Sequence, residues 1–490
     1  MQRTLAALFG AALAACASDP PSAPALPSAE RYTVEPVAAP AAVAGVHGGQ
    51  AQHFVPGPQM PTLWWSLFRS SALDALVQQA LAGNPTLERA SARLRQAQEN
   101  LRARSGATQY PKVDAKLSAN RIDVDPQALG VQGLPLNTPF NLYLATVGVS
   151  YTFDLFGATR NELAALRSEV DHQRFELEAA RLMLAGNVVT AAIREAQLRE
   201  QIADSDALVA LQQRQLTITE RLQQLGTAPA VEVSAQRAEL ARLRATQPEL
   251  QRQLEQVRHR LAVYVGQAPG NAQLPQFRLA DLQLPAELPL ALPSELARQR
   301  PDIRAAEALL QQASAQVGVA TANLYPQLTL SATVGSIGSS NGGDLFASGS
   351  GFYLLGASLA QPLFRGGELQ ARRRAAVAAY EQAGAAYKEV VLQGLQNVAD
   401  VLRALEADEA ALAARSEQAS RASDAYRITV GRYHAGGVSQ LAVLDAERVR
   451  LQADTERLQA IANRFTDAAA LFQALGGGWT RQDPTAALVR

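Results

Sequence analysis

The amino-acid sequence predicts an internally duplicated α+β fold in which each half carries two β-strands and one long helical hairpin. Two proline-free stretches, 140–228 and 363–483, hold apolar residues at every seventh position, a spacing typical of coiled coils and long packed helices. Near the start of each stretch, apolar and polar residues alternate over about ten positions, the period of a half-buried strand. Because this order of elements occurs twice, the sequence indicates a duplication.

The seven-residue repeat defines one long arm in each half. Its positions are Leu163, Val170, Leu177, Leu184, Ala191 and Leu198 in the first half and Val377, Gly384, Val391, Val398, Leu405 and Leu412 in the second. Each arm breaks once, at 225–229 and at 434–439, where glycine permits a chain reversal before a return arm. The arm over 366–433 should reach roughly 100 Å at about 1.5 Å per residue, so it must pack along other long helices.

The composition excludes several kinds of protein. The 490 residues include 45 basic and 45 acidic side chains, so no excess of positive charge indicates nucleic-acid binding. The only cysteine, Cys16, excludes a disulfide within the chain and a cysteine-based metal cluster. No two histidines have the spacing of metal ligands, and no glycine-rich phosphate loop occurs. We therefore expect no enzymatic activity, no metal and no cofactor.

The first residues predict a secretory signal peptide over 1–15. A short basic start precedes an apolar run, 5–15, that is too short to span a bilayer. Leu13-Ala14-Ala15-Cys16 resembles the lipobox of bacterial lipoproteins, which implies cleavage before Cys16 and lipidation of its sulfur. No aspartate follows Cys16 directly, which by the same resemblance favours the outer membrane. The alternative is an ordinary signal peptide with an incidental cysteine.

Residues 16–60 are interpreted as a lipid anchor and flexible tether, because proline, alanine and glycine dominate them. The first repeat, 61–280, opens with two short helices at about 73–82 and 86–103. Alternating runs at 113–119 and 141–153 then predict two strands, and Asp154-Leu155-Phe156-Gly157 starts the long helix. A proline-rich connector, 269–293, joins the two halves.

The second repeat, 281–480, follows the same plan. Arg300-Pro301-Asp302 opens a helix, and Tyr325-Pro326 echoes Tyr110-Pro111 before a strand at 328–334. A second strand is expected at 352–360, after which Pro362-Leu363-Phe364-Arg365-Gly366 echoes the turn of the first repeat. Residues 481–490 form a C-terminal tail.

The strand lengths suggest a membrane-spanning sheet. Tilted strands of about 9–11 residues cross an outer membrane, whereas four strands cannot close a barrel and open edges in lipid leave backbone groups unpaired. Several chains must therefore share one barrel. A homotrimer would supply twelve strands, and its helical hairpins would form a tube continuous with that barrel.

The chain resembles the TolC/OprM-type outer-membrane efflux channels of the NodT lipoprotein branch. The resemblance covers nearly everything after Pro61 and rests on a set of short motifs in a fixed order. They are Trp64-Trp65, Tyr110-Pro111 and its echo, Asp154-Leu155-Phe156-Gly157, the segments 432–439 and 443–448, and Ala474-Leu475-Gly476-Gly477-Gly478-Trp479. It implies a homotrimeric twelve-stranded transmembrane β-barrel on a long periplasmic α-helical barrel, in the outer membrane of a Gram-negative bacterium.

The same resemblance implies the function and the partners. The chain would be the outer-membrane exit duct of a tripartite efflux pump, passing drugs or other toxic small molecules. Its partners would be two further copies of itself, a periplasmic membrane-fusion adaptor, an inner-membrane pump of the RND type and outer-membrane lipid.

The resemblance also implies a periplasmic gate at Leu441, Asp445 and Arg448. Steps of four and three residues place all three on one helix face, so three copies would form an apolar ring and a charged ring. The alternative is an ordinary solvated ion pair beside a core leucine. Ala442 and Val438 depart from the pattern of some members, which carry a second acid and a restraining arginine there, so the gate has one acidic ring.

Further site residues follow from the resemblance alone. Glu232 and Tyr433 match positions that tie inner to outer hairpins in some members, although an incidental surface pair explains them equally well. The adaptor-docking tips are the two hairpin turns, where simple turn chemistry is the alternative. Their residues are Gly226, Thr227, Gly436, Gly437 and Ser439.

Two competing classes of protein explain less of the sequence. A coiled-coil scaffold accounts for the heptads, but not for the signal peptide, the lipobox or the four strands. An autotransporter-like adhesin requires a large passenger domain, which the sequence lacks.

Overall fold

The computed structural model describes residues 31–56, 61–123, 139–339 and 342–478, without the side chains of residues 297 and 298. The chain divides into two compact units. The described parts of the first unit are 93–123, 139–173, 306–339 and 342–387, and those of the second are 31–56, 61–92, 174–305 and 388–478. Both sequence repeats contribute to both units, so the compact units cut across the duplication.

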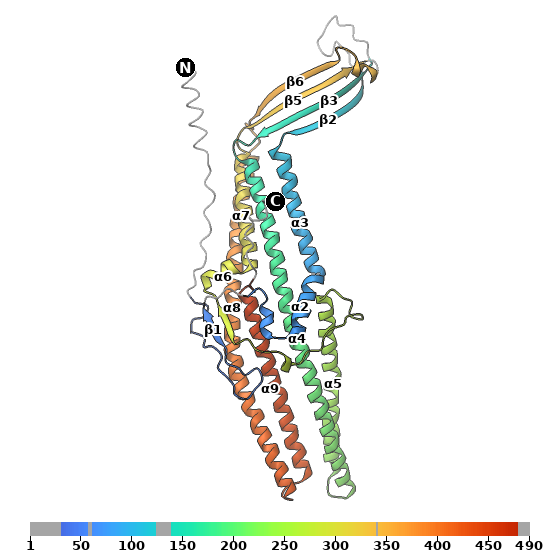
Figure 1. Cartoon of the computed structure of the whole chain (residues 1–490), viewed down its shortest axis with the longest axis vertical. Helices are drawn as coiled ribbons and strands as arrows, with labels where there is room; N and C mark the ends of the chain where they lie inside the picture. The colour runs from blue at the N-terminus through green and yellow to red at the C-terminus, as the bar shows by residue number, and fades with distance from the viewer. Residues whose placement is uncertain (1–30, 57–60, 124–138, 340–341, 479–490) are drawn as a thin grey trace. The chain divides into compact units, whose positions relative to one another are not determined.

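The first unit contains a four-stranded antiparallel sheet in the order β2-β3-β5-β6 (Figure 1). Its strands are β2 (Lys112–Ile122), β3 (Phe140–Phe153), β5 (Gln327–Gly338) and β6 (Gly351–Ala360). The four strands predicted from alternation are confirmed, two from each repeat. β2 pairs only with β3 and β6 only with β5 within this sheet, so both outer strands have a free edge.

One face of the sheet is apolar over its central positions. Ala115 lies opposite Val147, Val147 opposite Val334 and Val334 opposite Tyr353, and directly opposed residues share a face. The other face of β2 carries Lys112, Asp114 and Lys116, one position out of phase with the apolar set. The pairing register therefore brings the central apolar residues of all four strands onto one face.

The long helices have equal lengths in the two repeats. The first hairpin consists of α4 (Ala158–Gln224) and α5 (Ala230–Tyr264), and the second of α8 (Glu368–His434) and α9 (Gln440–Ala474). α4 and α8 each have 67 residues, and α5 and α9 each have 35. The predicted pair of hairpins is confirmed. Within the described residues, no helix combines the length and apolar character needed to cross a bilayer.

The shorter elements lie where the sequence predicts them, with six additions. α2 (Ser71–Gly83), α3 (Pro85–Gln109) and α7 (Pro301–Ala322) match the predicted helices. The additions in the second unit are β1 (His53–Pro56), β4 (Glu287–Leu290), α6 (Pro293–Gln299) and the 3-10 helices η1 (Trp64–Phe68) and η3 (Leu279–Asp281), while the first unit adds η4 (Gly342–Phe346).

The core of the second unit is aromatic. Trp64 is fully buried and stacks on Phe472 of α9, with ring centroids 5.5 Å apart and planes inclined by 17°. The ring of Phe68 packs against that of Phe465, with centroids 6.2 Å apart. The end of α9, with small and aromatic side chains, is therefore enclosed by η1.

The segment before η1 is packed in its later part, which differs from the tether interpretation of 16–60. β1 pairs in parallel with β4, and the fully buried Arg464 donates hydrogen bonds to the carbonyl oxygens of Gly48 and Gln50, at 3.2 and 2.8 Å, and to Oε1 of Gln52, at 3.4 Å. A buried guanidinium must be satisfied by acceptors, and here two backbone carbonyls and the Gln52 side chain of this segment supply them. We call residues 40–56 the strap.

The connector predicted at 269–293 is also part of the core. Leu279, Leu282 and Leu288 are almost fully buried, and Gln283 N–H donates to the carbonyl of Phe68 at 2.9 Å. Proline-rich composition therefore did not distinguish a packed irregular segment from an exposed linker.

Candidate gate and docking turns

The two hairpin turns have the same backbone geometry. Gly226 and Gly436 adopt positive φ angles of 76° and 74°. The N–H of Thr227 donates to Leu222 O at 2.9 Å, and that of Gly437 donates to Arg432 O at 2.8 Å. This is the αL closure that ends helices, and a glycine adopts it without a Cβ penalty.

The turns differ in how the return helix begins. Ser439 caps α9, because its Oγ accepts a hydrogen bond from Ala442 N–H at 3.3 Å. Pro229 precedes α5 and offers no side-chain cap. The hydroxyl of Thr227 donates to Leu222 O at 2.9 Å, a bond that Gly437 has no side chain to make. All five predicted docking residues therefore lie at the two turns.

The structure brings two of the three predicted gate residues together. Nη2 of Arg448 donates to Oδ1 of Asp445 at 2.7 Å, and Nη1 of Arg448 donates to Gln452 at 3.2 Å. In this ion pair, the side chain of Asp445 is 63% exposed and that of Arg448 is 31% exposed. Leu441, one turn earlier on α9, is half-buried.

Arg448 also lies within electrostatic range of the first hairpin. The pKa of Glu239 on α5 is held below its usual value, chiefly by the hydrogen bond from Arg242 and to a smaller extent by the charges of Arg242 and Arg448. The charge of Arg448 therefore acts on an acidic group of the other hairpin, in addition to the ion pair with Asp445.

The other predicted pair is not joined within the chain. Among the described residues, no hydrogen bond links Glu232, in the first turn of α5, to Tyr433, near the end of α8. Tyr433 is 40% exposed, and its ring lies 5.9 Å from that of His434. Cys16 lies outside the described residues.

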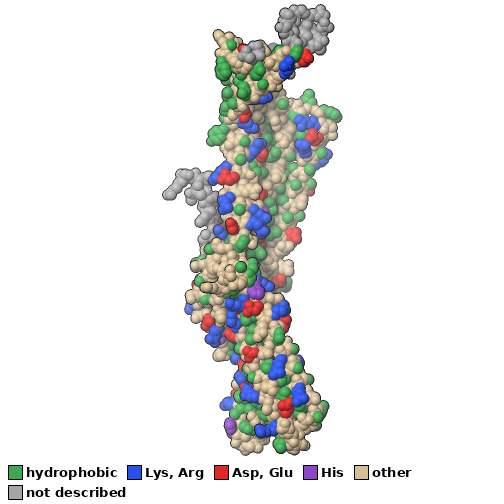
Figure 2. Space-filling view, turned by 90° about the vertical axis from the view of Figure 1, so that its right-hand side faces the viewer, with side chains coloured by type: hydrophobic (Ala, Val, Ile, Leu, Met, Phe, Trp, Pro, Cys, Tyr) green, Lys and Arg blue, Asp and Glu red, His purple; other side chains and the backbone are tan. Residues whose placement is uncertain are grey.

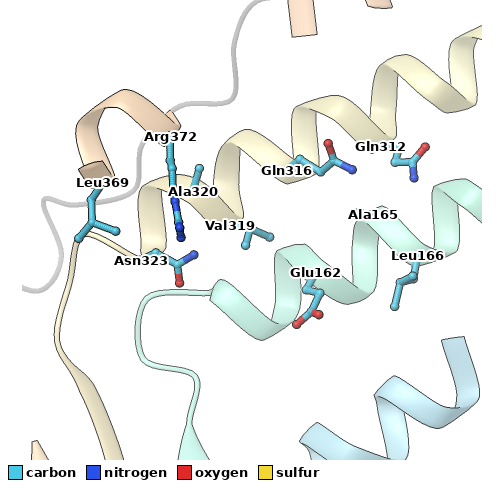
Figure 3. Close-up of a pocket in the computed structure, with 10 residues that line it drawn as sticks. All are labelled: Glu162, Ala165, Leu166, Gln312, Gln316, Val319, Ala320, Asn323, Leu369 and Arg372. Atoms are coloured by element: carbon cyan, nitrogen blue, oxygen red, sulfur yellow. The ribbon is translucent and has the colours of Figure 1, made fainter. Parts of the chain in front are cut away.

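A cavity in the first unit was not predicted from the sequence. It has a volume of about 320 Å³, and Figure 3 shows lining residues from α4, α7 and the start of α8, with Arg372 and Asn323 at one end and Gln312 at the other. Its charged groups already have partners: Arg104 donates to Glu162, and Arg372 pairs with Glu368, each at 2.6 Å. The cavity therefore offers neutral amides and an apolar wall rather than a free charge.

Neither the face drawn in Figure 2 nor any group of metal-ligating side chains among the described residues indicates a further site. On the face drawn in Figure 2, basic and acidic side chains are interspersed. Among the described residues, no three His, Cys, Asp or Glu side chains lie close enough to hold a metal ion.

An amphipathic four-stranded sheet with two free edges, joined to two long helical hairpins, is the architecture of an outer-membrane channel subunit. The comparisons agree. The outer membrane efflux protein family matches residues 76–267 and 292–477, more than half of the chain. The outer-membrane channel OprN matches with a TM-score of 0.78 and 28% identity, over 93% of this chain and 99% of OprN.

Two relatives carry functional names. The pyoverdine export outer membrane protein OpmQ of Pseudomonas putida is 31% identical over 427 residues, covering 86% of this chain and 89% of OpmQ. The toluene efflux pump outer membrane protein TtgC of Pseudomonas putida is 30% identical over 424 residues, covering 86% of each protein. The chain belongs to the outer membrane efflux protein family. It is an exit channel of the outer membrane, as the sequence analysis predicted.

Proposed function

We propose that this chain forms a homotrimeric exit duct that completes a tripartite efflux pump. The observation that carries the proposal is the pair of free strand edges on β2 and β6. Strands of 10 to 14 residues suit a bilayer, but lipid offers no hydrogen-bond partners to an open edge. Three copies of this four-stranded sheet close a barrel of twelve strands, an even number within the known range.

The proposed partners contact the hairpin turns. Gly226, Thr227, Gly436, Gly437 and Ser439 would meet a periplasmic membrane-fusion adaptor, which connects the duct to an inner-membrane pump of the RND type. This role is supported by the exposed, glycine-closed geometry of both turns. The duct itself would catalyse no reaction.

The proposed cargo is a small organic molecule, such as a drug or another toxic compound. The support comes from the names of two relatives, one an exporter of pyoverdine and the other part of a toluene efflux pump. These compounds differ in polarity, so we expect the duct to accept a class of molecules rather than one substrate.

The periplasmic mouth would be closed at rest by Leu441, Asp445 and Arg448. The ion pair on α9 supports this, because three copies of it around an axis would form one charged ring beside an apolar ring of Leu441. Glu232 and Tyr433 would restrain the mouth by a hydrogen bond that ties the inner to the outer hairpin.

Cys16 would carry the lipid anchor in the outer membrane. The support is the sequence Leu13-Ala14-Ala15-Cys16. Cys16→Ser should abolish labelling with radioactive palmitate, whereas the trimer should persist because the barrel holds it in the membrane. Labelling that survives in this variant would refute the anchor.

The trimer is tested by the mass of the purified full-length protein in detergent. We expect the mass of three chains after the contribution of detergent is subtracted. A stable monomer under the same mild detergent conditions would refute the shared barrel.

A further inference from the structure

An exposed basic segment, 361–374, lies where β6 leaves the sheet and α8 begins. Ala360 ends β6 opposite Gln327, and Phe153 ends β3 opposite Leu328, so both strands reach the helices at the same end of the sheet. In an outer-membrane channel subunit, strands of 10 to 14 residues are the part that crosses lipid. The segment therefore lies at the membrane surface on the helix side.

The segment carries an excess of positive charge. It holds four arginines and one glutamate, whereas the equivalent segment of the first repeat, 153–164, holds one arginine and two acids. Glu368 pairs with Arg372 at 2.6 Å. Arg365, Arg373 and Arg374 are exposed and make no ion pair or side-chain hydrogen bond with any residue that the structure describes. Three guanidinium groups therefore lack a counter-charge in the described chain.

The turn before α8 does not need this charge to form. In the first repeat, Asp154 caps α4, because its carboxylate accepts hydrogen bonds from the N–H groups of Thr159 at 3.1 Å and Arg160 at 2.8 Å. Pro362 stands at the equivalent position of the second repeat, and Arg365 is an additional residue in its turn. The second repeat has a basic turn where the first has an acidic one that is satisfied by its own helix.

An apolar side chain lies beside the arginines and stays uncovered in the equivalent arrangement of the first repeat. Leu363 is 93% exposed. Its counterpart Leu155 is still 52% exposed, although the second repeat packs beside it through the stacked rings of Phe156 and Tyr325. A second copy placed in the same way would therefore leave much of Leu363 uncovered, so lipid is the occupant that remains.

The same comparison selects two of the three arginines. Leu163, the counterpart of Arg373, is buried, so a second copy would cover Arg373. Ala164, the counterpart of Arg374, is only half-buried, and Arg365 has no counterpart. Side chains on a helix tilt towards its N-terminus, and long arginine side chains extend further in that direction, so Arg374 leans back from α8 towards the membrane surface.

We propose that Leu363, Arg365 and Arg374 form a docking surface for an anionic phospholipid in the leaflet on the helix side of the outer membrane. Leu363 enters the boundary of the acyl chains, and the two guanidinium groups bind the headgroup phosphate, whose oxygens match their paired donors. Arginines next to a membrane-spanning segment attract anionic lipids in this way. The inference rests on the proposed function, because the sheet must span the membrane.

The lipid preference is tested by native mass spectrometry of the full-length protein in detergent, titrated separately with phosphatidylglycerol and phosphatidylcholine of identical acyl chains. Phosphatidylglycerol should bind more tightly. Arg365→Gln with Arg374→Gln should weaken its binding by about 25-fold, since each arginine near a membrane contributes about fivefold, and should leave phosphatidylcholine unchanged.

The matched control is Arg214→Gln with Arg260→Gln. It removes two exposed arginines of α4 and α5 that have no ion partner among the described residues, and it should change neither lipid's binding. Equal weakening by both double variants, or no preference for phosphatidylglycerol in the wild type, would overturn the surface. Displacement of the lipid by an equal concentration of glycerol 3-phosphate would also overturn it, because the arginines would then recognise a soluble phosphate.

The position of Leu363 is tested by tryptophan fluorescence in vesicles of phosphatidylcholine and phosphatidylglycerol whose acyl chains carry bromine near the headgroup. The added emission of Leu363→Trp, relative to the parent protein, should be quenched. Leu225→Trp, at a leucine of the hairpin turn that is 72% exposed, should not be quenched. Leu155→Trp occupies the equivalent junction of the first repeat and should also be quenched.

These variants separate failure of the inference from failure of the proposed function. Quenching of Leu155→Trp without quenching of Leu363→Trp would show that protein covers Leu363, and would overturn the docking surface while the membrane-spanning sheet stands. Equal quenching of Leu225→Trp would overturn it as well, because the signal would not depend on the junction. Quenching at neither Leu155→Trp nor Leu363→Trp would overturn the placement of the sheet in the membrane, and with it the proposed duct.

Discussion

The two hairpins have equal lengths but hold their helices together with different buried groups. In the first hairpin, the fully buried carboxylate of Glu195 on α4 accepts hydrogen bonds from Arg199 and from Arg258 on α5, each at 2.8 Å. It also accepts one from the N–H of Phe277 at 3.2 Å. Two cations and a backbone donor therefore compensate this one acid.

The second hairpin instead places two acids against each other. The carboxyl groups of Asp408 on α8 and Asp467 on α9 share a hydrogen bond, and Oδ2 of Asp408 has no partner among the described residues. Burial, followed by the charge of Asp467, raises the pKa of Asp408 to about 7. The nearby Arg464 opposes this shift, but its hydrogen bonds go to the strap.

The comparison shows how one duplicated scaffold acquires two electrostatic behaviours. In the first hairpin, two guanidinium groups compensate the buried carboxylate of Glu195, so that removing either side would leave a buried group without its partner. A pair of facing carboxyls is stable only while a proton is shared between them. We therefore expect the stability of the second hairpin to depend on pH.

The hairpins also differ near their turns. Counted from the first residue of each return helix, Leu441, Asp445 and Arg448 of α9 correspond to Val231, Ala235 and Ala238 of α5. The first hairpin thus carries no charge at the positions of the candidate gate. Closure of the periplasmic mouth by these three residues would therefore involve the second hairpin and not the first.

The largest expected effect comes from neutralising the buried acid Glu195. Glu195→Gln removes the counter-charge of Arg199 and Arg258, which are 25% and 23% exposed. We expect a loss of roughly 3 kcal/mol, the low end of the range for a broken buried ion pair, because both guanidinium groups reach solvent. The measurement is denaturant unfolding of the helices followed by circular dichroism.

Glu249→Gln is the control for this variant, since Glu249 pairs with Arg252 on an exposed part of α5. It should leave unfolding unchanged. If the two substitutions destabilise the protein equally, the buried cluster at Glu195 contributes no more than a surface pair.

A smaller, pH-dependent effect is expected at the paired acids. Because the pKa of Asp408 is raised in the fold, its contribution to stability is complete below the usual value of 3.8 and is lost as the pH rises towards about 7. Asp408→Asn keeps a neutral side chain at every pH. It should raise the melting temperature at pH 8 by several degrees and leave it nearly unchanged at pH 4.

The groups around Asp408 sharpen this prediction. Asp467, Arg464 and Glu409 remain in the variant, so any pH dependence left over reports on them. Asp424→Asn, in the exposed pair with Arg427, is the matched control and should shift neither melting temperature. A gain at Asp408 that is the same at both pH values would show that the substitution improves packing rather than removing a titration.

Periodicity in the sequence predicted the repeated architecture well, because strands and helices impose periods of two and about 3.6 on apolar residues. It placed all four strands of the sheet and both hairpins. The three-residue spacing of Asp445 and Arg448 on one helix also predicted that their side chains could form an ion pair. The strap and β4 were missed, since four-residue strands contain too few residues for a period to show.

Contacts between residues far apart in the chain could not be predicted from the sequence either. Arg464 looks like a solvated helix residue, yet it is fully buried because the strap, more than 400 residues earlier, supplies its acceptors. Asp408 and Asp467 lie on different helices, so only the packing of α8 on α9 brings them together. Among the described residues no hydrogen bond joins Glu232 of α5 to Tyr433 of α8, so the tie between the two hairpins stays a prediction.

The most direct test of the account is the conductance of the purified trimer in a planar bilayer. The wild-type channel should conduct poorly, because the second hairpins close its mouth, and Leu441→Ala with Asp445→Ala should raise the conductance severalfold. Val231→Ala, at the corresponding position of the first hairpin, should leave it unchanged. A wild-type channel as conductive as the double variant, or an equal increase from Val231→Ala, would contradict closure by Leu441, Asp445 and Arg448.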